Sequence, residues 1–207
     1  METATAKAVR ARTKRVKETP LTEADWVDAA TGILVEENVR GIKVEKLCAK
    51  LGVTKGSFYW HFKKRSDVLI ALLKAWRRRT TLNVIQNIAK SGAQGMGRLR
   101  SMIEMPRHAK AGEVAAIEMS IRDWARRVEM PKEAIVEVDT IRIEYFEQIF
   151  RDAGFDEAEV KRRSYLTYCV LMGDSILHRT LGGYVERRDY VDAAVAILSQ
   201  PRGDVGS

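Results

Sequence analysis

Apolar residues recur at three- and four-residue spacings along almost the whole chain, and this periodicity constrains the fold more than any other feature of the sequence. Proline is scarce, with four in 207 residues. No stretch long enough for a strand alternates apolar and polar residues as a half-buried strand would. The pattern therefore predicts an all-α protein. A chain of this length can bury a substantial core without disulfides or a metal, and we expect neither a metal nor a cofactor.

Capping residues and glycines divide the periodic pattern into successive helices. Thr22, followed three residues later by Asp25, forms an approximate capping box for a first helix over residues 22–38, and Gly41 is suited to close it as a C-terminal cap. A fourth helix is expected to start at the capping residue Ser66, and small residues at 91–97 to connect it to the rest. The remaining expected helices span residues 44–51, 54–62, 99–105, 114–128, 133–153, 158–181 and 190–198.

The helices expected at 44–51 and 54–62 are spaced as in a helix-turn-helix. Gly52 can take the turn conformation, and the hydroxyl of Thr54 can cap the second helix. The first residues of that helix would face a DNA major groove, where phosphate contacts should outnumber base contacts. Phe58 and Phe62, spaced i and i+4, are expected to pack inward.

Two residues of this segment have open roles. Trp60 could lie in the core, in the groove or at an interface. His61 could be a structural histidine, but the three basic residues that follow it favour a phosphate contact.

Positive charge is concentrated at the N-terminal end. The net charge is +8, of which residues 1–65 carry +6 and the remaining residues +2. Such a distribution suits a polyanion partner at one end of the molecule. Residues 1–20 read either as a basic arm that contacts DNA or as a solubilising tail, and they lack the apolar region of a secretory signal. With no apolar run long enough to cross a bilayer, we expect a cytoplasmic protein without membrane contact.

The two cysteines and one acidic residue raise separate questions. Cys48 and Cys169 lie far apart in helical patterns, so both are expected to be small buried apolar residues. Asp174 lies in an apolar stretch and needs a partner. That partner could be Arg179, a residue of a second subunit or a cationic ligand, and a structural partner is favoured.

Residues 24–76, and above all residues 52–62 followed by Lys64 and Asp67, resemble the DNA-binding domain of the TetR family of bacterial transcriptional regulators. The resemblance implies three DNA-binding helices, a fourth helix that leads to a ligand-binding domain, and a homodimer formed by the last two long helices. It also implies release from a palindromic operator by a small molecule. The DNA contacts expected from the motif and the resemblance are Lys43, Thr54, Lys55, Gly56, Ser57, Tyr59, Trp60, His61 and Lys64.

Lys43 departs from the family pattern, which usually has Ser or Thr at this position. A lysine side chain cannot accept a capping hydrogen bond. The second helix is therefore expected either to fray at its start or to use Lys43 as a further phosphate contact.

These observations predict a basic arm at 1–20, a helix-turn-helix domain at 21–65 and a helical effector-binding and dimerisation domain at 66–207. Helical bundles often enclose a pocket, although Met and aromatic residues at helical spacing are usually core. The candidate pocket residues are Met102, Met119, Trp124, Phe146, Tyr168 and Met172.

The sequence thus predicts a sequence-specific DNA-binding regulator, a repressor released from double-stranded DNA by an effector. One alternative is an architectural DNA-binding protein, which would not need a large C-terminal domain with an apolar interior. The other is an all-α enzyme, and its support is thin. The chain has no GxSxG, HExxH or CxxC motif, and its three histidines are far apart in the sequence.

Overall fold

The computed structural model describes residues 20–108 and 111–200, and every regular element in these two ranges is helical. The prediction of an all-α protein is therefore confirmed. The expected basic arm, apart from Pro20, lies outside the described residues. The elements are α1 (Glu23–Glu37), η1 (Val39–Gly41), α2 (Val44–Leu51), α3 (Lys55–His61), α4 (Arg65–Arg77), η2 (Arg78–Leu82), α5 (Asn83–Lys90), α6 (Met96–Glu104), η3 (Met105–Arg107), α7 (Ala111–Ala125), α8 (Glu129–Asp152), α9 (Glu157–Thr180) and α10 (Arg187–Ser199).

The first helix spans its expected range, but its C-terminal cap differs from the expected one. The backbone N–H of Thr22 donates to the Asp25 carboxylate at 2.9 Å, and the Asp25 N–H donates back to the Thr22 hydroxyl. The expected range is confirmed, since α1 ends at Glu37, but the closing cap is Asn38, with φ at 65°, and not Gly41. Asparagine tolerates this left-handed region, and its side chain accepts a hydrogen bond from the Arg40 N–H.

Two expected caps are wrong. Thr54 precedes α3 with an extended backbone, but its side chain makes no capping hydrogen bond. The fourth helix starts at Arg65, one residue before Ser66. Its N-cap residue is Lys64, and the carboxylate of Asp67 in the first turn accepts the backbone N–H groups of Lys63 and Lys64, both at 3.1 Å. A carboxylate in the first turn also favours the helix dipole.

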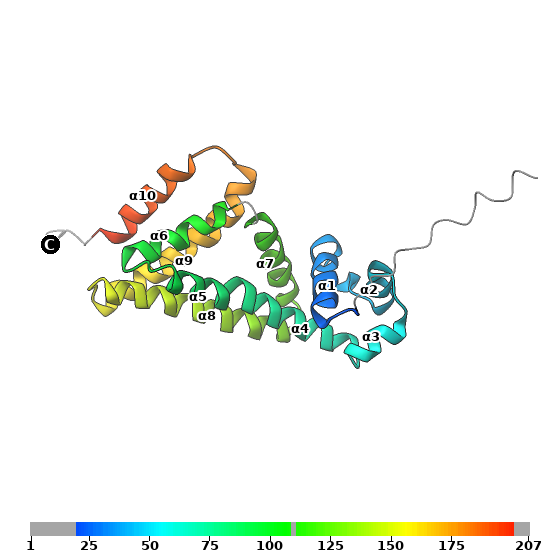
Figure 1. Ribbon diagram of the computed structural model, residues 1–207. Helices are drawn as coiled ribbons and strands as arrows, with labels where there is room; N and C mark the ends of the chain where they lie inside the picture. Colours follow the sequence, from blue (N-terminus) through cyan, green and yellow to red (C-terminus); the bar gives the residue numbers. More distant parts are fainter. Residues whose placement is uncertain (1–19, 109–110, 201–207) are drawn as a thin grey trace, which may run out of the picture.

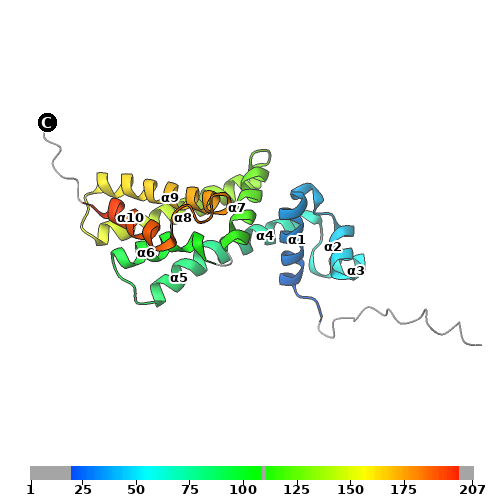
Figure 2. The ribbon, with the colours of Figure 1, turned by 90° about the horizontal axis from the view of Figure 1, so that it is seen from above.

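The molecule has two parts joined by α4 (Figure 1). The first three helices group at one end and the helices from α5 onward at the other, and the view from above shows the same arrangement (Figure 2). α4, η2 and α5 follow one another without a break, so the expected fourth helix is one long helix with a π-helical segment at η2. Such segments are rare and often mark functional sites. α8 packs along α9, and α10 packs on α6.

Within residues 20–108 and 111–200, two clusters of buried apolar residues form the core. The first joins α1–α4 and continues into α7 and α8 through Ile121, Trp124 and Val138. The second lies among α5, α6, α8, α9 and α10. The long helix therefore packs in both clusters.

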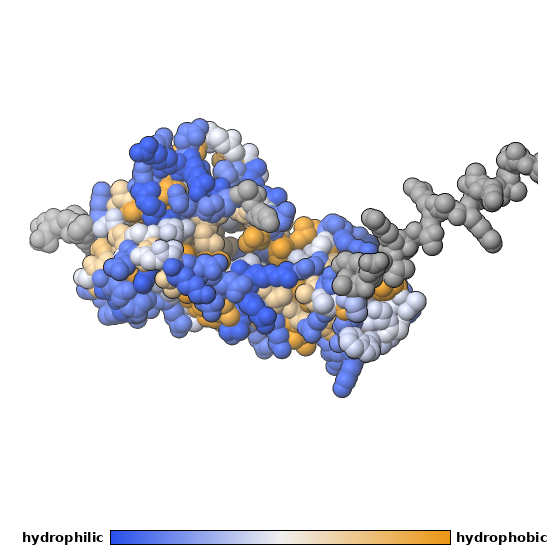
Figure 3. Space-filling view, viewed as in Figure 1, coloured by the Kyte–Doolittle hydropathy of each residue, from blue (hydrophilic) through white to orange (hydrophobic). Residues whose placement is uncertain are grey.

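The cysteine prediction is half right. Cys48 is buried, as expected, but Cys169 is exposed. Cys169 lies on the side of α9 that faces away from the bundle, where Tyr165 and Leu166 are also exposed. On the face shown in Figure 3, hydrophilic residues predominate and apolar residues are interspersed among them.

Most later helices start or end a few residues away from the expected positions, as is usual for helix ends. The main difference is at Pro131, expected between helices but found within the first turn of α8. Proline is tolerated there because first-turn N–H groups have no partner within the helix. No helix in the described ranges is long and apolar enough to span a membrane.

Candidate nucleic-acid interface and cavity

α3 is anchored through an aromatic contact. Phe58 is fully buried, and its ring meets that of Trp26 from α1 edge-on, with 5.4 Å between centroids. Phe62 is also buried, 5.6 Å from Phe58. The prediction that both phenylalanines pack inward is confirmed, and their packing determines which side of α3 faces outward.

The turn between α2 and α3 depends on a glycine. Gly52 has φ at 73°, a left-handed conformation that other residues adopt at a cost. The Val53 N–H donates to the Cys48 carbonyl at 3.0 Å, and the Cys48 thiol lies 3.5 Å from the Thr54 carbonyl oxygen. These contacts hold the start of α3 against the end of α2.

The outward side of α3 carries aromatic and basic groups. Trp60 is 82% exposed and Tyr59 57% exposed, so Trp60 lies outside the core. Lys55 forms an ion pair of 2.6 Å with Glu45 of α2. Their hydrogen bond is the main reason why the pKa of Lys55 is raised and that of Glu45 lowered. A phosphate contact by Lys55 would therefore compete with the Glu45 carboxylate for this ammonium, which has three N–H donors.

The other predicted DNA contacts are exposed, except for two. Thr54, Gly56, Lys43 and Lys64 are exposed, whereas Ser57 and His61 are half-buried. The His61 ring lies 4.6 Å from that of Trp60 and 6.0 Å from that of Trp26. Lys43 precedes α2 without a side-chain cap, as expected for a lysine.

A brace that the sequence did not predict holds this part together. The Arg65 side chain donates to the Val39 carbonyl at 2.5 Å and also to the Ile42 carbonyl. It thereby ties the start of α4 to the segment between α1 and α2. Lys50 of α2 adds an ion pair of 3.2 Å with Glu36 of α1.

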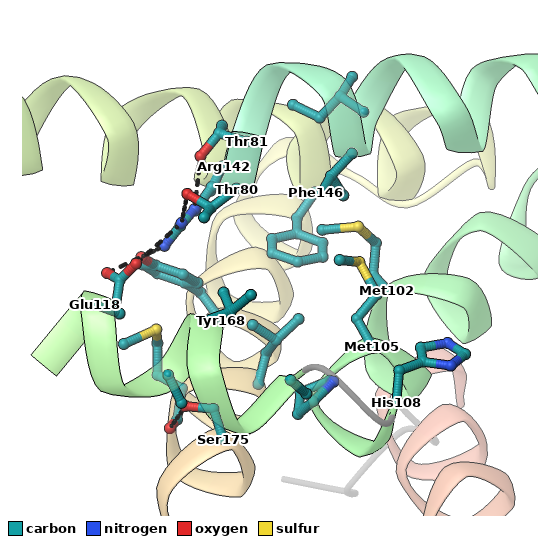
Figure 4. A pocket seen from close by; sticks show the side chains of 18 residues that line it. Thr80, Thr81, Met102, Met105, His108, Glu118, Arg142, Phe146, Tyr168 and Ser175 are labelled. Atoms are coloured by element: carbon teal, nitrogen blue, oxygen red, sulfur yellow. Dashed lines mark hydrogen bonds and ion pairs between the residues drawn. The ribbon is translucent and has the colours of Figure 1, made fainter. Parts of the chain in front are cut away.

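The C-terminal part contains a cavity of about 250 Å³ (Figure 4). Its lining is mostly apolar and comes from η2, α5, α6, η3, α7, α8 and α9. Four of the six predicted pocket residues line it, namely Met102, Phe146, Tyr168 and Met172.

The other two predicted pocket residues lie elsewhere. Met119 is 45% exposed, and Trp124 packs in the first apolar cluster. Glu118 lies on the cavity side of α7, and the next residue points about 100° away around the helix. Helical spacing alone could not determine which side of α7 faces the cavity.

Seven polar side chains form a network at one end of the cavity, here called the Arg142 cluster: Thr80, Thr81, Glu118, Arg122, Asp139, Arg142 and Tyr168. Glu118 is 5% exposed and Arg142 9% exposed. Figure 4 shows Arg142 between Glu118 and the two threonines of η2, with His108 at the opposite end of the cavity.

Burial and neighbouring groups both affect the pKa values of the Arg142 cluster. Burial disfavours the charge of Arg142, but Glu118 and Tyr168 outweigh it, so the pKa of Arg142 is raised. Burial raises the pKa of Tyr168 to about 12. The arginine is therefore charged and the phenol neutral at pH 7.

Asp174 has a structural partner, although not the expected Arg179. Both of its carboxylate oxygens accept hydrogen bonds from Arg107, at 2.8 and 3.1 Å, and both side chains are buried. The Arg107 guanidinium also lies 4.0 Å from the centre of the Tyr190 ring. Arg179 instead donates to the Gly112 carbonyl. The Arg107 contacts join η3 to α9 and α10.

Comparisons with known proteins agree with this arrangement. Residues 27–72 match the family model described as bacterial regulatory proteins of the tetR family. Over 60 residues the chain is 35% identical to the HTH-type transcriptional regulator SrpR of Pseudomonas putida, a match that covers 29% of this chain and 28% of SrpR. The N-terminal helix-turn-helix is a TetR-family domain. The matched segment spans less than a third of SrpR.

The fold beyond the TetR-family domain is also shared. FadR of Bacillus subtilis, solved in complex with stearoyl-CoA, superposes with a TM-score of 0.66 at 18% identity, over 86% of this chain and 97% of FadR. SmeT, the repressor of the Stenotrophomonas maltophilia multidrug efflux pump SmeDEF, gives 0.62 at 19% identity, over 86% and 88%. At such identities the likeness shows a common fold.

The charged residues of the cavity were missed from the sequence. Glu118 and Arg142 are single charged residues among apolar ones, between Ile117 and Met119 and between Ile141 and Ile143. A charge on a buried helix face needs a partner, so each could have been selected as Asp174 was. Their pairing depends on the packing of α7 against α8.

Proposed function

We propose that this protein is a sequence-specific DNA-binding transcriptional regulator, a repressor that acts in the cytoplasm and binds a palindromic operator as a homodimer. A small-molecule effector in the cavity would release it from double-stranded DNA. The observation that carries the proposal is the TetR-family helix-turn-helix, which buries Phe58 and leaves Tyr59, Trp60 and the lysines near α3 exposed.

The exposed side of α3 suits a DNA major groove. Lys55 at its start and Lys43 and Lys64 beside it can contact phosphates, while Tyr59 and Trp60 offer a hydroxyl, an indole N–H and apolar area to the groove. Thr54, Gly56, Ser57 and His61 complete the proposed set. His61 and Ser57 are half-buried, and their proposed contacts are to the phosphate backbone of the DNA.

The outward side of α9 and α10 supports a homodimer. Tyr165, Leu166 and Leu177 on α9 and Ile197 on α10 are exposed apolar side chains. Pairing two copies through these helices would remove this surface from water. The two α3 helices would then lie about 34 Å apart, or a multiple of that, and read a palindrome.

The contacts of the cavity support a response to an effector. Thr80 and Thr81 of η2 line it, and η2 continues directly from α4. The Trp76 indole of α4 donates to Glu118 at 3.2 Å. A ligand that binds one arrangement of these contacts more tightly would shift α4 and the distance between the two α3 helices.

Neither alternative accounts for both parts of the molecule. A purely architectural DNA-binding protein would not need the cavity beside α4. The relatives found are transcriptional regulators, which argues against an enzyme. The stearoyl-CoA complex of FadR supports a ligand-binding role for this fold.

The salt dependence of DNA binding tests the DNA side of this proposal. Lys64→Ala should weaken binding to any duplex and reduce the slope of log K against log salt by about 0.9 for each lost phosphate contact. The matched control is Lys132→Ala, an equally simple charge removal at an exposed site on α8. Fluorescence anisotropy with a labelled duplex measures both. A Lys64→Ala variant with wild-type affinity and slope would contradict the assigned role.

A further inference from the structure

The cavity lining offers a ligand mainly apolar contacts. Apart from the polar end, the lining consists largely of aliphatic, methionine and aromatic side chains, among them Val84, Ile85, Met102, Phe146 and Leu171. Its volume of about 250 Å³ is slightly below the range of about 300–1,000 Å³ typical of ligand pockets. Such a space suits a small and mostly apolar molecule.

Arg142 looks like an anion-binding group, but its donors are already used. A guanidinium has five N–H groups. Nε donates to Thr81 at 3.1 Å, Nη1 to Glu118 at 3.3 Å and Tyr168 at 3.1 Å, and Nη2 to Thr80 and Glu118, both at 3.2 Å. A ligand carboxylate could reach Arg142 only by breaking these bonds.

Glu118 is saturated in the same way. A carboxylate offers about four acceptor positions. Oε1 accepts from Arg122 at 2.9 Å and from Arg142, and Oε2 accepts from Trp76 at 3.2 Å and from Arg142. A cationic ligand therefore meets no available acceptor on this carboxylate.

The cluster is also balanced in charge. Arg122 and Arg142 carry two positive charges, Glu118 and Asp139 two negative ones, and Tyr168 donates to Asp139 at 2.6 Å. An ion entering this end of the cavity would lose its hydration without gaining an opposite charge, which costs several kcal/mol. The Ser175 hydroxyl donates to the Met172 carbonyl, and His108 at the opposite end is exposed to solvent.

We infer that the cavity selects an uncharged, mostly apolar small molecule and discriminates against organic anions and cations of the same size. This rests on the proposed role of the cavity as the effector site. The Arg142 cluster then acts as a neutral polar wall that excludes charge, and shape and apolar contact determine affinity.

Three probe molecules with one carbon skeleton test this inference in the wild-type protein without DNA. At pH 7, 4-phenylbutan-1-ol is neutral, 4-phenylbutanoate is an anion and 4-phenylbutylammonium a cation. Isothermal titration calorimetry should give a dissociation constant for the alcohol at least about ten-fold below those of both ions. An ion that binds as tightly as the alcohol, or no binding by any of the three, would overturn the inference.

Two variants locate the effect. Met172→Trp fills the cavity and should weaken alcohol binding about ten-fold or more; unchanged affinity would place the alcohol elsewhere and overturn the inference. Glu118→Gln leaves Arg142 with an unbalanced charge and should shift the ratio of anion to alcohol affinity toward the anion by about ten-fold. Its matched control is Glu113→Gln, which removes an exposed carboxylate from the same helix and should leave the ratio unchanged.

The wild-type comparison and Met172→Trp decide the question even if Glu118→Gln fails to fold, which circular dichroism would show. DNA binding is measured separately, by anisotropy without any ligand. Loss of the charge preference with intact DNA binding would refute only the inference about the ligand. Absence of DNA binding would refute the proposed function.

Discussion

Replacing Arg142 with methionine should destabilise the fold more than any removal of an exposed charge. Arg142 is buried against Glu118, and its guanidinium supplies hydrogen bonds to α7, α9 and η2. Methionine keeps much of the side-chain volume and removes the charge, so the change acts mainly on the polar network.

The magnitude follows from what remains after the change. Removing one partner of a buried ion pair costs about 3–5 kcal/mol, because the other charge stays buried. Here Glu118 keeps Arg122 and the Trp76 indole. The expected loss is therefore near the lower limit, about 3 kcal/mol of unfolding free energy.

Urea unfolding followed by far-ultraviolet circular dichroism measures this loss. The matched control is Arg151→Met, whose side chain is 38% exposed and pairs with Glu147 and Glu157. Exposed pairs contribute about 0–1 kcal/mol. If Arg142→Met were as stable as Arg151→Met, the Arg142 cluster would not hold the helices together as described.

Three further predictions concern stability. Phe58→Ala should cost about 3–5 kcal/mol, because a fully buried ring would leave a cavity against Trp26; urea unfolding within about 1 kcal/mol of wild type would contradict the anchoring of α3. Gly52→Ala should cost about 1–2 kcal/mol because of the positive φ, whereas a neutral effect would show that the turn can relax. Folding raises the pKa of Tyr168 to about 12, from about 10 in unfolded chains, so the unfolded chain releases this proton first. Its stabilising contribution is present below pH 10 and falls by about 1.4 kcal/mol per pH unit as the pH rises from 10 to 12. From about pH 10 to 12 the free energy of unfolding of the wild type should fall relative to that of Tyr168→Phe. Parallel dependences of this free energy on pH in the two proteins would contradict the prediction.

The helix-turn-helix could be predicted from the sequence because its signals are local. The spacing of Val44, Leu47, Cys48 and Leu51 before Gly52 predicts a helix and a turn from neighbouring residues alone. The caps were harder, because several neighbouring residues can satisfy backbone N–H groups at a helix start. At α4 the Asp67 carboxylate accepts the N–H groups of Lys63 and Lys64, and Ser66 lies inside the helix.

The cavity could be predicted only in part. Met102, Phe146, Tyr168 and Met172 were found because apolar residues on inward faces usually meet in the core. The partner of Asp174 is Arg107, 67 residues earlier in the chain, and no local signal joins them. The Arg142 cluster likewise depends on how α7, α8 and α9 pack, which single-helix patterns do not determine.

The most direct test of the central claim is a selection of bound fragments from a random double-stranded DNA library with the full chain. A dimer that presents two α3 helices should enrich a palindrome whose half-sites are centred about 10 base pairs, or a multiple of that, apart. Selection without enrichment of any palindrome would contradict the claim that this protein is a sequence-specific dimeric regulator.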